Sequence, residues 1–315
     1  MRAALQQTAP GDRVLVAVSG GADSLALTAA AAFEGPRLGR AVGAVHVDHG
    51  LHPGSADQAR RVVDQARGLG LDDVGVRVVD VVDHASGPEG AARAARYAAL
   101  DAAAEEAGAA AVLLGHTRDD QAEQVLLGLA RGSGARSLAG MPASRGRYRR
   151  PLLGLTHATL VDACRHQGLQ PWPDPANDDP AYTRNRVRHR VLPVLEAELG
   201  PGIADALARS AELLRADADL LDSLAAEARQ RCRDASPGPV GGLGTGDLAA
   251  LPEALRARVI RAEMVAAGVS PSALTLGHVR SAEALVVSWR GQGPVSLPGG
   301  LVAVRRCDRL VVEAP

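Results

Sequence analysis

Short apolar runs alternate with longer segments of mixed polarity through the first half of the chain. The continuous or nearly continuous apolar runs occupy residues 14–18, 41–47, 74–82 and 111–114. Such runs are typical of strands that are buried on both faces of a parallel sheet. The segments between them, such as 57–69 and 89–107, are long enough for crossover helices. This pattern predicts an α/β fold with a doubly wound parallel sheet, in which ligands bind at the carboxyl ends of the strands.

The pattern changes after Pro193. Apolar residues then recur at helical spacing, which predicts one long amphipathic linker helix that extends to Arg233. A Pro/Gly/Ser-rich stretch at 235–246 marks a boundary. Beyond it we predict two helices, the first between Pro252 and Gly268, and a hairpin after the turn at 297–300. The predicted parts are therefore an α/β domain at 1–198, the linker helix at 199–235 and a small α+β domain at 236–315.

All 35 basic side chains are arginines, because the 315 residues include no lysine. The composition excludes a Walker A loop and catalysis by a lysine side chain. Three widely spaced cysteines argue against a disulfide framework and against CxxC chemistry. We find no signal peptide and no apolar stretch of about 18 residues, so we expect a cytoplasmic protein without a membrane partner. A net charge of −1 means that any nucleic-acid site would need a local concentration of arginine.

The first predicted strand leads directly into the string Ser19-Gly20-Gly21-Ala22-Asp23-Ser24. Two glycines permit a tight turn, and the amides of the turn and of the following helix can converge on an anion together with the serine hydroxyls. A capped strand-to-helix turn without a ligand is the alternative, because Asp23 and Ser24 are ordinary capping residues. The position of the complete string at a strand end favours an anion site.

This string resembles the PP-loop of ATP pyrophosphatases, Rossmann-like enzymes that cleave ATP to AMP and pyrophosphate while they adenylate a substrate. The resemblance implies that residues 19–24 bind ATP and that Asp23 lies near the metal and the phosphates. The loop indicates ATP chemistry without naming the acceptor. Amidotransferases, tRNA thiolases and lysidine synthetases all remain open.

Polar residues follow two further strands. His46, Asp48 and His49 follow the second, but alternation along a strand sends neighbouring side chains to opposite faces, so adenosine recognition or loop ordering is favoured over a metal site. Asp120 and Glu123 follow the fourth strand on one face of a helix start. Such residues are often only partners of the helix dipole. Their position beside His116 makes them candidates for binding an ammonium group.

Arginines mark two candidate phosphate-binding surfaces. Arg93 and Arg96 share a helix face that suits phosphate oxygens, although a solvated basic face is an equal alternative. Between Arg145 and Arg190, nine arginines stand against four acidic residues, a local excess that favours contact with a nucleic-acid backbone over a solvated loop. The only two asparagines of the chain, Asn177 and Asn185, also lie here, and we expect specific hydrogen bonds to hold both.

Together with 131–134, 140–141 and 150–153, the blocks 172–179 and 182–188 resemble the tRNA(Ile)-lysidine synthetase family in order and near-correct spacing. Residues 297–310 are similar to the first C-terminal domain of that family, and the further domain of its long members is expected to be absent. Two positions depart from the family pattern. Thr117 stands where a second histidine is usual, so the chain has no adjacent histidine pair there, and Ala176 stands where a serine is usual before the asparagine.

The resemblance implies that ATP and Mg²⁺ adenylate the wobble cytidine of tRNA(Ile) with a CAU anticodon, and that free L-lysine then displaces AMP. It implies ATP binding and catalysis in 1–198 and tRNA binding in 236–315. The implied catalytic residues are Asp23, Arg93 and His116. The remaining implied roles are ATP binding by His46 and Asp48 with the loop, lysine binding by Asp120 and Glu123, and tRNA binding by Arg145, Arg149, Arg150, Arg184, Asn185 and Arg188.

Two rival functions have distinct expectations. A PP-loop tRNA thiolase would normally have paired or catalytic cysteines, whereas those of this chain are isolated. A non-catalytic adenine-nucleotide-binding module would keep the glycine loop but would not need the Asp120/Glu123 pair. The sequence leaves the Mg²⁺ ligands undefined and a homodimer open.

Overall fold

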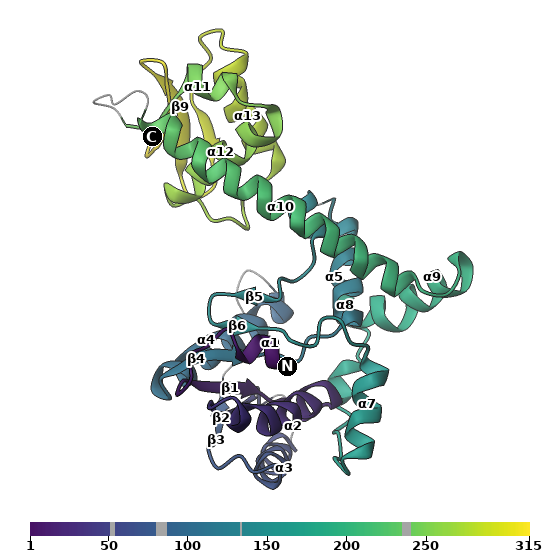
Figure 1. Ribbon diagram of the computed structural model, residues 1–315. Helices are drawn as coiled ribbons and strands as arrows, with labels where there is room; N and C mark the ends of the chain where they lie inside the picture. The colour runs from purple at the N-terminus through teal and green to yellow at the C-terminus, as the bar shows by residue number, and fades with distance from the viewer. Residues whose placement is uncertain (51–53, 80–86, 133, 235–240) are drawn as a thin grey trace. The chain divides into compact units, whose positions relative to one another are not determined.

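The computed structural model describes residues 1–50, 54–79, 87–132, 134–234 and 241–315 (Figure 1). The chain divides into two compact units, residues 1–215 and residues 216–315, and the division falls inside one long helix. No helix in these described ranges is both long and apolar enough to span a membrane. The domain limits expected from the sequence stay a prediction.

The first unit contains the expected parallel sheet. Its strands are β1 (Arg13–Ala17), β2 (Ala41–Asp48), β3 (Val74–Val78), β4 (Ala109–Leu113), β5 (Ser144–Arg145) and β6 (Tyr148–Arg149). They are ordered β3-β2-β1-β4-β6-β5, and only β5 is antiparallel to its neighbour. The doubly wound α/β class is therefore confirmed. The predicted third strand is longer than β3, and its residues 80–82 lie outside the described ranges.

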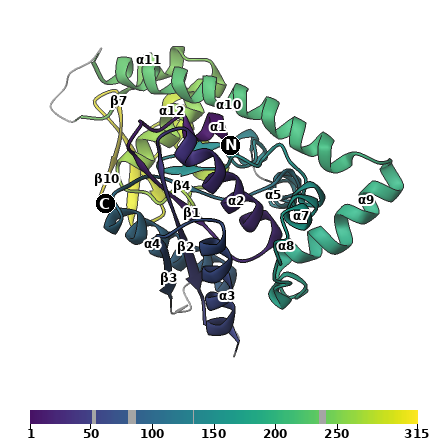
Figure 2. The same ribbon diagram turned by 60° about the horizontal axis from the view of Figure 1, so that its bottom comes forward.

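Helices cover both faces of this sheet (Figure 2). Alternation along β1 sends Val14 and Val16 to one core, which they share with α2 and α3, whereas Leu15 packs with Leu100 of α4 on the other face. The helices of the unit are α1 (Arg2–Leu5), α2 (Ala22–Arg37), α3 (Ser55–Gly68), α4 (Gly87–Glu106), α5 (Arg118–Ala130), α6 (Ala135–Leu138), α7 (His157–His166), α8 (Thr183–Arg186) and α9 (Leu192–Leu199). A 3-10 turn (Pro175–Asn177) and a π turn (Val187–Val191) flank α8.

The second unit begins within α10 (Ile203–Asp234), the predicted long helix. Its other elements are β7 (Leu243–Gly244), α11 (Thr245–Ala250), α12 (Glu253–Ala266), α13 (Leu276–Val287), β8 (Val295–Leu297), β9 (Leu301–Arg306) and β10 (Arg309–Glu313). The strands form an antiparallel sheet ordered β7-β10-β9-β8. The two predicted helices are present as α12 and α13, and the predicted hairpin as β9 and β10. β7, β8 and α11 were not predicted, because they are too short to produce a periodic pattern.

Candidate active site

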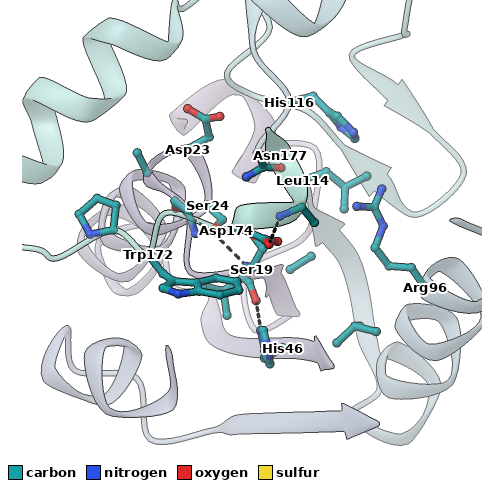
Figure 3. A pocket seen from close by; sticks show the side chains of 18 of the residues that line it. Ser19, Asp23, Ser24, His46, Arg96, Leu114, His116, Trp172, Asp174 and Asn177 are labelled. Atoms are coloured by element: carbon teal, nitrogen blue, oxygen red, sulfur yellow. Dashed lines mark hydrogen bonds between the residues drawn. The ribbon is translucent and has the colours of Figure 1, made fainter. Parts of the chain in front are cut away.

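A cavity of about 670 Å³ lies at the carboxyl ends of β1, β2 and β4 (Figure 3). Parallel strands bring these ends to one edge of the sheet, so loops that are distant in sequence share its wall. The segment from Pro171 to Arg188 completes the lining. Twelve of the predicted site residues line the cavity: Ser19, Gly21, Ala22, Asp23, Ser24, His46, Asp48, His116, Asp120, Arg184, Asn185 and Arg188.

The other predicted residues lie outside this lining. They are Gly20, Arg93, Glu123, Arg145, Arg149 and Arg150. Arg96, one turn beyond Arg93 on α4, lines the cavity instead, and its Nε is buried with no hydrogen-bond partner in the described part of the chain. The guanidinium of Arg93 lies 5.0 Å from the centroid of the Tyr97 ring, and its Nη2 donates to the Tyr97 hydroxyl. The sequence pointed to the helix face that Arg93 and Arg96 share, but Arg96, and not Arg93, lines the cavity.

The glycine loop is organised around the hydroxyl of Ser24. This oxygen accepts hydrogen bonds from the amides of Ser19 and Gly20, each at 3.1 Å, and donates to the carbonyl of Gly21 at 2.9 Å. Helix α2 begins directly after Gly21, which provides no side-chain cap. The amides of its first turn are therefore available to an anion, and the helix dipole favours negative charge there. This geometry suits an anion such as a phosphate and requires no lysine.

Gly20 should tolerate no side chain. Its φ is +92°, and a Cβ would lie 2.5 Å from Gln58 Nε2 and 2.7 Å from Val62 Cγ2. We therefore expect Gly20→Ala to weaken ATP binding by tenfold or more and to lower thermal stability, because strain of this kind costs about 1–3 kcal/mol. Gly21→Ala is the matched control, since its Cβ would meet only Ser19 Oγ at 3.7 Å. Equal ATP affinity for the two variants, measured by calorimetry, would contradict this interpretation.

Asp23 has a partner that the sequence did not reveal. Nδ1 of His157 lies 2.8 Å from Asp23 Oδ1, and the backbone amide of His157 donates to Asp119 Oδ2 at 2.7 Å. The hydrogen bond that the Asp23 carboxylate accepts from His157 is the main cause that raises the pKa of His157. His157 is the first residue of α7 and ties the loop to α5. The available sequence signal was only Thr156, whose side chain caps that helix.

His116 is held as a neutral imidazole. Burial is the main cause that lowers its pKa to about 3, and Arg96 and Arg150 act in the same direction while Asp120 opposes them. Arg150 Nε donates to His116 Nδ1 at 3.2 Å. Because arginine has no acceptor, this contact assigns the imidazole proton to Nε2. His116 can therefore donate a hydrogen bond at neutral pH without carrying charge.

This pKa makes a prediction for stability. The unfolded imidazole titrates near 6.5 and the folded one at about 3. Between these values the unfolded chain binds a proton that the folded chain does not, so His116 should reduce stability as the pH falls through this window. We expect the free energy of unfolding, measured by urea denaturation, to fall less between pH 7 and pH 5 in His116→Asn than in the natural chain. Equal losses would show that His116 does not stay neutral.

Two carboxylates and two guanidiniums form a cluster beside His116. Glu123 has no solvent exposure, and each of its oxygens accepts a 2.6 Å hydrogen bond, one from Arg184 Nε and one from Arg188 Nε. Asp120 Oδ1 accepts from the Nη2 atoms of the same arginines at 2.9 and 3.1 Å. Burial would raise the pKa of Asp120, but Arg184 and the other positive neighbours outweigh it, and the pKa is lowered. The cluster is formally neutral and offers both signs of charge.

Arg150 requires a correction. It was predicted to contact tRNA, but it is only 5% exposed, and it donates to the carbonyl of Pro142, the hydroxyl of Tyr97 and His116. Its guanidinium is thus committed to protein groups that fix His116. Among the other predicted arginines, Arg145 is exposed and Arg149 is half-buried.

Asn185 has the specific hydrogen bonds that were expected. Its Nδ2 donates to the carbonyls of Ala176 and Asp179 at 2.8 and 2.9 Å, which orders the segment between the 3-10 turn and α8. Asn177 lies on the cavity wall. At the exit of β2, His46 Nδ1 lies 2.8 Å from the Val18 carbonyl and Asp48 Oδ1 accepts from the Gly50 amide. Both side chains therefore order the strand exits, one of the roles expected for them.

The part of the chain that the structure describes contains no group of three or more His, Cys, Asp or Glu side chains that could hold a metal ion. Its three cysteines are separate: Cys164 lies buried in the first unit, Cys232 is buried in the second, and Cys307 is exposed. The arrangement offers no cysteine pair for sulfur transfer.

Comparisons with known proteins agree with this geometry. A family model described as the PP-loop domain matches residues 2–195, and one described as the TilS substrate binding domain matches residues 243–311. The U34-tRNA thiolase NcsA from Methanococcus maripaludis, solved with its [4Fe-4S] cluster, superposes with a TM-score of 0.56 at 18% identity. That match covers 68% of this chain and 78% of the thiolase, and it shows a shared fold alone.

Curated relatives match over almost the full chain, and each is named tRNA(Ile)-lysidine synthase. The protein of Leifsonia xyli is 58% identical over 98% of this chain and 91% of its own length. The protein of Streptomyces coelicolor is 56% identical over 95% of this chain and 85% of its own length. The protein of Thermobifida fusca is 54% identical over 100% of this chain and 95% of its own length. With its PP-loop domain and this extent of similarity, the chain belongs to the tRNA(Ile)-lysidine synthase family of tRNA-modifying enzymes.

Proposed function

We propose that this enzyme ligates lysine to the wobble cytidine of tRNA(Ile) with a CAU anticodon. ATP transfers its adenylyl group to the 2-carbonyl oxygen of the cytosine, and pyrophosphate leaves. The ε-amine of lysine then attacks carbon 2, and AMP leaves with the original oxygen. The observation that carries the proposal is one cavity lined by the phosphate loop, by neutral His116 and by the Asp120–Arg184 pair.

The chain supplies distinct groups for the first step. The amides at the start of α2 and the hydroxyl of Ser19 bind the pyrophosphate portion of ATP. The hydroxyl of Ser24, whose proton is donated to the Gly21 carbonyl, keeps the loop in shape. Arg96 supplies positive charge beside the reacting phosphate, since it lines the cavity and no described residue hydrogen-bonds to its Nε. It takes the role first expected of Arg93. His116 Nε2 donates a hydrogen bond to the base or to the phosphate.

The cavity also fits a Mg²⁺ ion that arrives with ATP. This ion prefers one or two carboxylates together with phosphate oxygens and water. Asp23 lines the cavity beside the loop, and its side chain is 29% exposed, so a hard oxygen donor stands where phosphates would lie. We propose Asp23 as the protein ligand of the ion, which when bound would neutralise phosphate charge.

The neutral cluster suits free lysine, which carries two ammonium groups and one carboxylate. Asp120 lines the cavity and can attract an ammonium group, while Arg184 and Arg188 can bind a carboxylate. Glu123 has no exposure, so it acts by holding the two arginines in place. Aiming the ε-amine at carbon 2 turns a bimolecular attack into one between bound partners.

tRNA contacts are proposed for both units. Exposed Arg145 and half-buried Arg149 suit backbone phosphates, while Arg184, Asn185 and Arg188 lie at the cavity where the anticodon base would enter. The match of residues 243–311 to a substrate-binding domain supports a second tRNA contact there. A cytoplasmic location, a homodimer and domain limits at 1–198, 199–235 and 236–315 stay predictions.

Release of AMP and pyrophosphate tests this function. Purified protein with ATP, lysine and tRNA(Ile) bearing CAU should produce both, and omission of either lysine or the tRNA should prevent turnover. Equal release without the tRNA would contradict the proposal. ATP binding with no release under any condition would favour a nucleotide-binding module.

A further inference from the structure

The aromatic side chain of Trp172 also lines the cavity. Figure 3 shows its indole on the side of Ser19 and His46, with His116 and Arg96 across the pocket. An aromatic plane on a polar cavity wall is a stacking surface for a nucleobase. We propose that Trp172 stacks on the adenine of ATP; this inference rests on the proposed function and assigns a base-binding residue to it.

The chain around Trp172 is fixed to the phosphate loop. Its backbone amide donates to the carbonyl of Gly20 at 2.9 Å, and a proline stands on each side of it. Two residues earlier, Gln170 exchanges a pair of hydrogen bonds with the side chain of Gln65 on α3, at 2.9 and 3.1 Å. The backbone that carries the indole is thus fixed before any ligand binds, which reduces the entropy cost of stacking.

A second feature of the same wall points to a base. The carboxamide of Gln58, on α3, lines the cavity and is only 5% exposed, and its Nε2 has no hydrogen-bond partner among the residues that the structure describes. A buried donor without a partner is unfavourable, so it marks a place where a ligand acceptor completes the site. Gln58 lies against Gly20, the same residue that anchors Trp172. The indole of Trp172 offers a flat surface for the face of adenine, and Gln58 Nε2 offers a donor for an acceptor nitrogen on its edge.

The position selects adenine over the tRNA cytosine. Trp172 is attached to the loop that binds the phosphates of ATP, so the base on those phosphates is the base within its reach. His116 and Asp120 come from the exit of β4 and the start of α5, where the cytosine and lysine are proposed to meet. Stacking on Trp172 therefore sets the orientation of ATP, while the wall that carries His116 and Asp120 binds the cytosine and lysine.

Intrinsic fluorescence tests this directly. The chain has two tryptophans, and Trp289→Phe leaves Trp172 as the single emitter without altering the cavity. ATP and AMP should quench this emission saturably, whereas tripolyphosphate, which can occupy only the loop, should not. Trp172→Ala should weaken ATP binding about tenfold and leave tripolyphosphate binding unchanged, and Trp172→Phe should restore most of the affinity.

The contrary results are separable. ATP binding at natural affinity in Trp172→Ala, or ATP binding to the Trp289→Phe chain without quenching, would overturn the inference alone. Quenching by tripolyphosphate, or by tRNA without ATP, would assign the response to loop movement or to cytosine and would also overturn it. No ATP binding by the natural chain would refute the proposed function together with the inference.

Discussion

Asp23→Asn should reduce AMP release with tRNA and lysine by a hundredfold or more. The substitution keeps the size of the side chain but removes the negative charge at the phosphate loop, and groups that stabilise transferring charge are typically worth about 10²–10³ in rate. Folding should be unaffected, because the carboxylate is part-exposed and its hydrogen-bond partner His157 can accept or donate. AMP measured by chromatography over a range of Mg²⁺ concentrations would report the loss.

The matched control for this variant is Asp57→Asn. Asp57 is also an acidic residue in the first turn of a helix, but it belongs to α3, is exposed, and does not line the cavity. It should retain full activity. A rate for Asp23→Asn within threefold of the natural enzyme would remove Asp23 from the proposed machinery.

Among the variants considered, Glu123→Ala should lower the free energy of unfolding the most, by about 3 kcal/mol. Removing one partner from a buried charge network leaves the other charges without compensation, which is costly. Here two guanidiniums would lose their 2.6 Å hydrogen bonds to a carboxylate that solvent does not reach. The same change should raise the KM for lysine more than the KM for ATP, because Arg184 and Arg188 would lose their fixed positions. Urea denaturation and steady-state kinetics measure the two effects.

Asp205→Ala provides the comparison. Asp205 pairs with Arg118 at 2.9 Å, but both side chains are about one-third exposed, and such a pair contributes less than about 1 kcal/mol. Comparable destabilisation by the two variants would show that burial of Glu123 does not determine its effect. A parallel rise in the KM values for ATP and lysine would contradict the assignment of the cluster to lysine.

Local sequence patterns predicted much of the sheet and the edge at which the cavity lies. Runs such as 41–47 are nearly continuous in apolar residues, which predicted buried strands. Because ligands bind at the carboxyl ends of such strands, the loop after β1, His46 and His116 were expected at one edge of the sheet, and all three line the cavity. These inferences depend only on periodicity and on the geometry of parallel strands.

The contacts that sequence could not predict join distant segments. Arg184 and Arg188 follow Glu123 by more than 60 residues, and only the packing of α8 and the π turn near α5 makes them its partners. His157 reaches Asp23 across 134 residues in the same way. Arg150 lies in an arginine-rich segment that suggested a surface, yet tertiary packing buries it. Local pattern identifies which side chains carry charge, whereas partner choice is a property of the folded chain.

Mass spectrometry of the modified tRNA tests the central claim most directly. Enzyme, ATP and isotopically labelled lysine are incubated with unmodified tRNA(Ile) bearing CAU, and the anticodon fragment is isolated after nuclease digestion. We expect a mass gain of one labelled lysine less one water at the wobble cytidine, dependent on ATP. An unchanged fragment in the presence of bound ATP, or a gain of sulfur when a sulfur donor is supplied, would contradict the account.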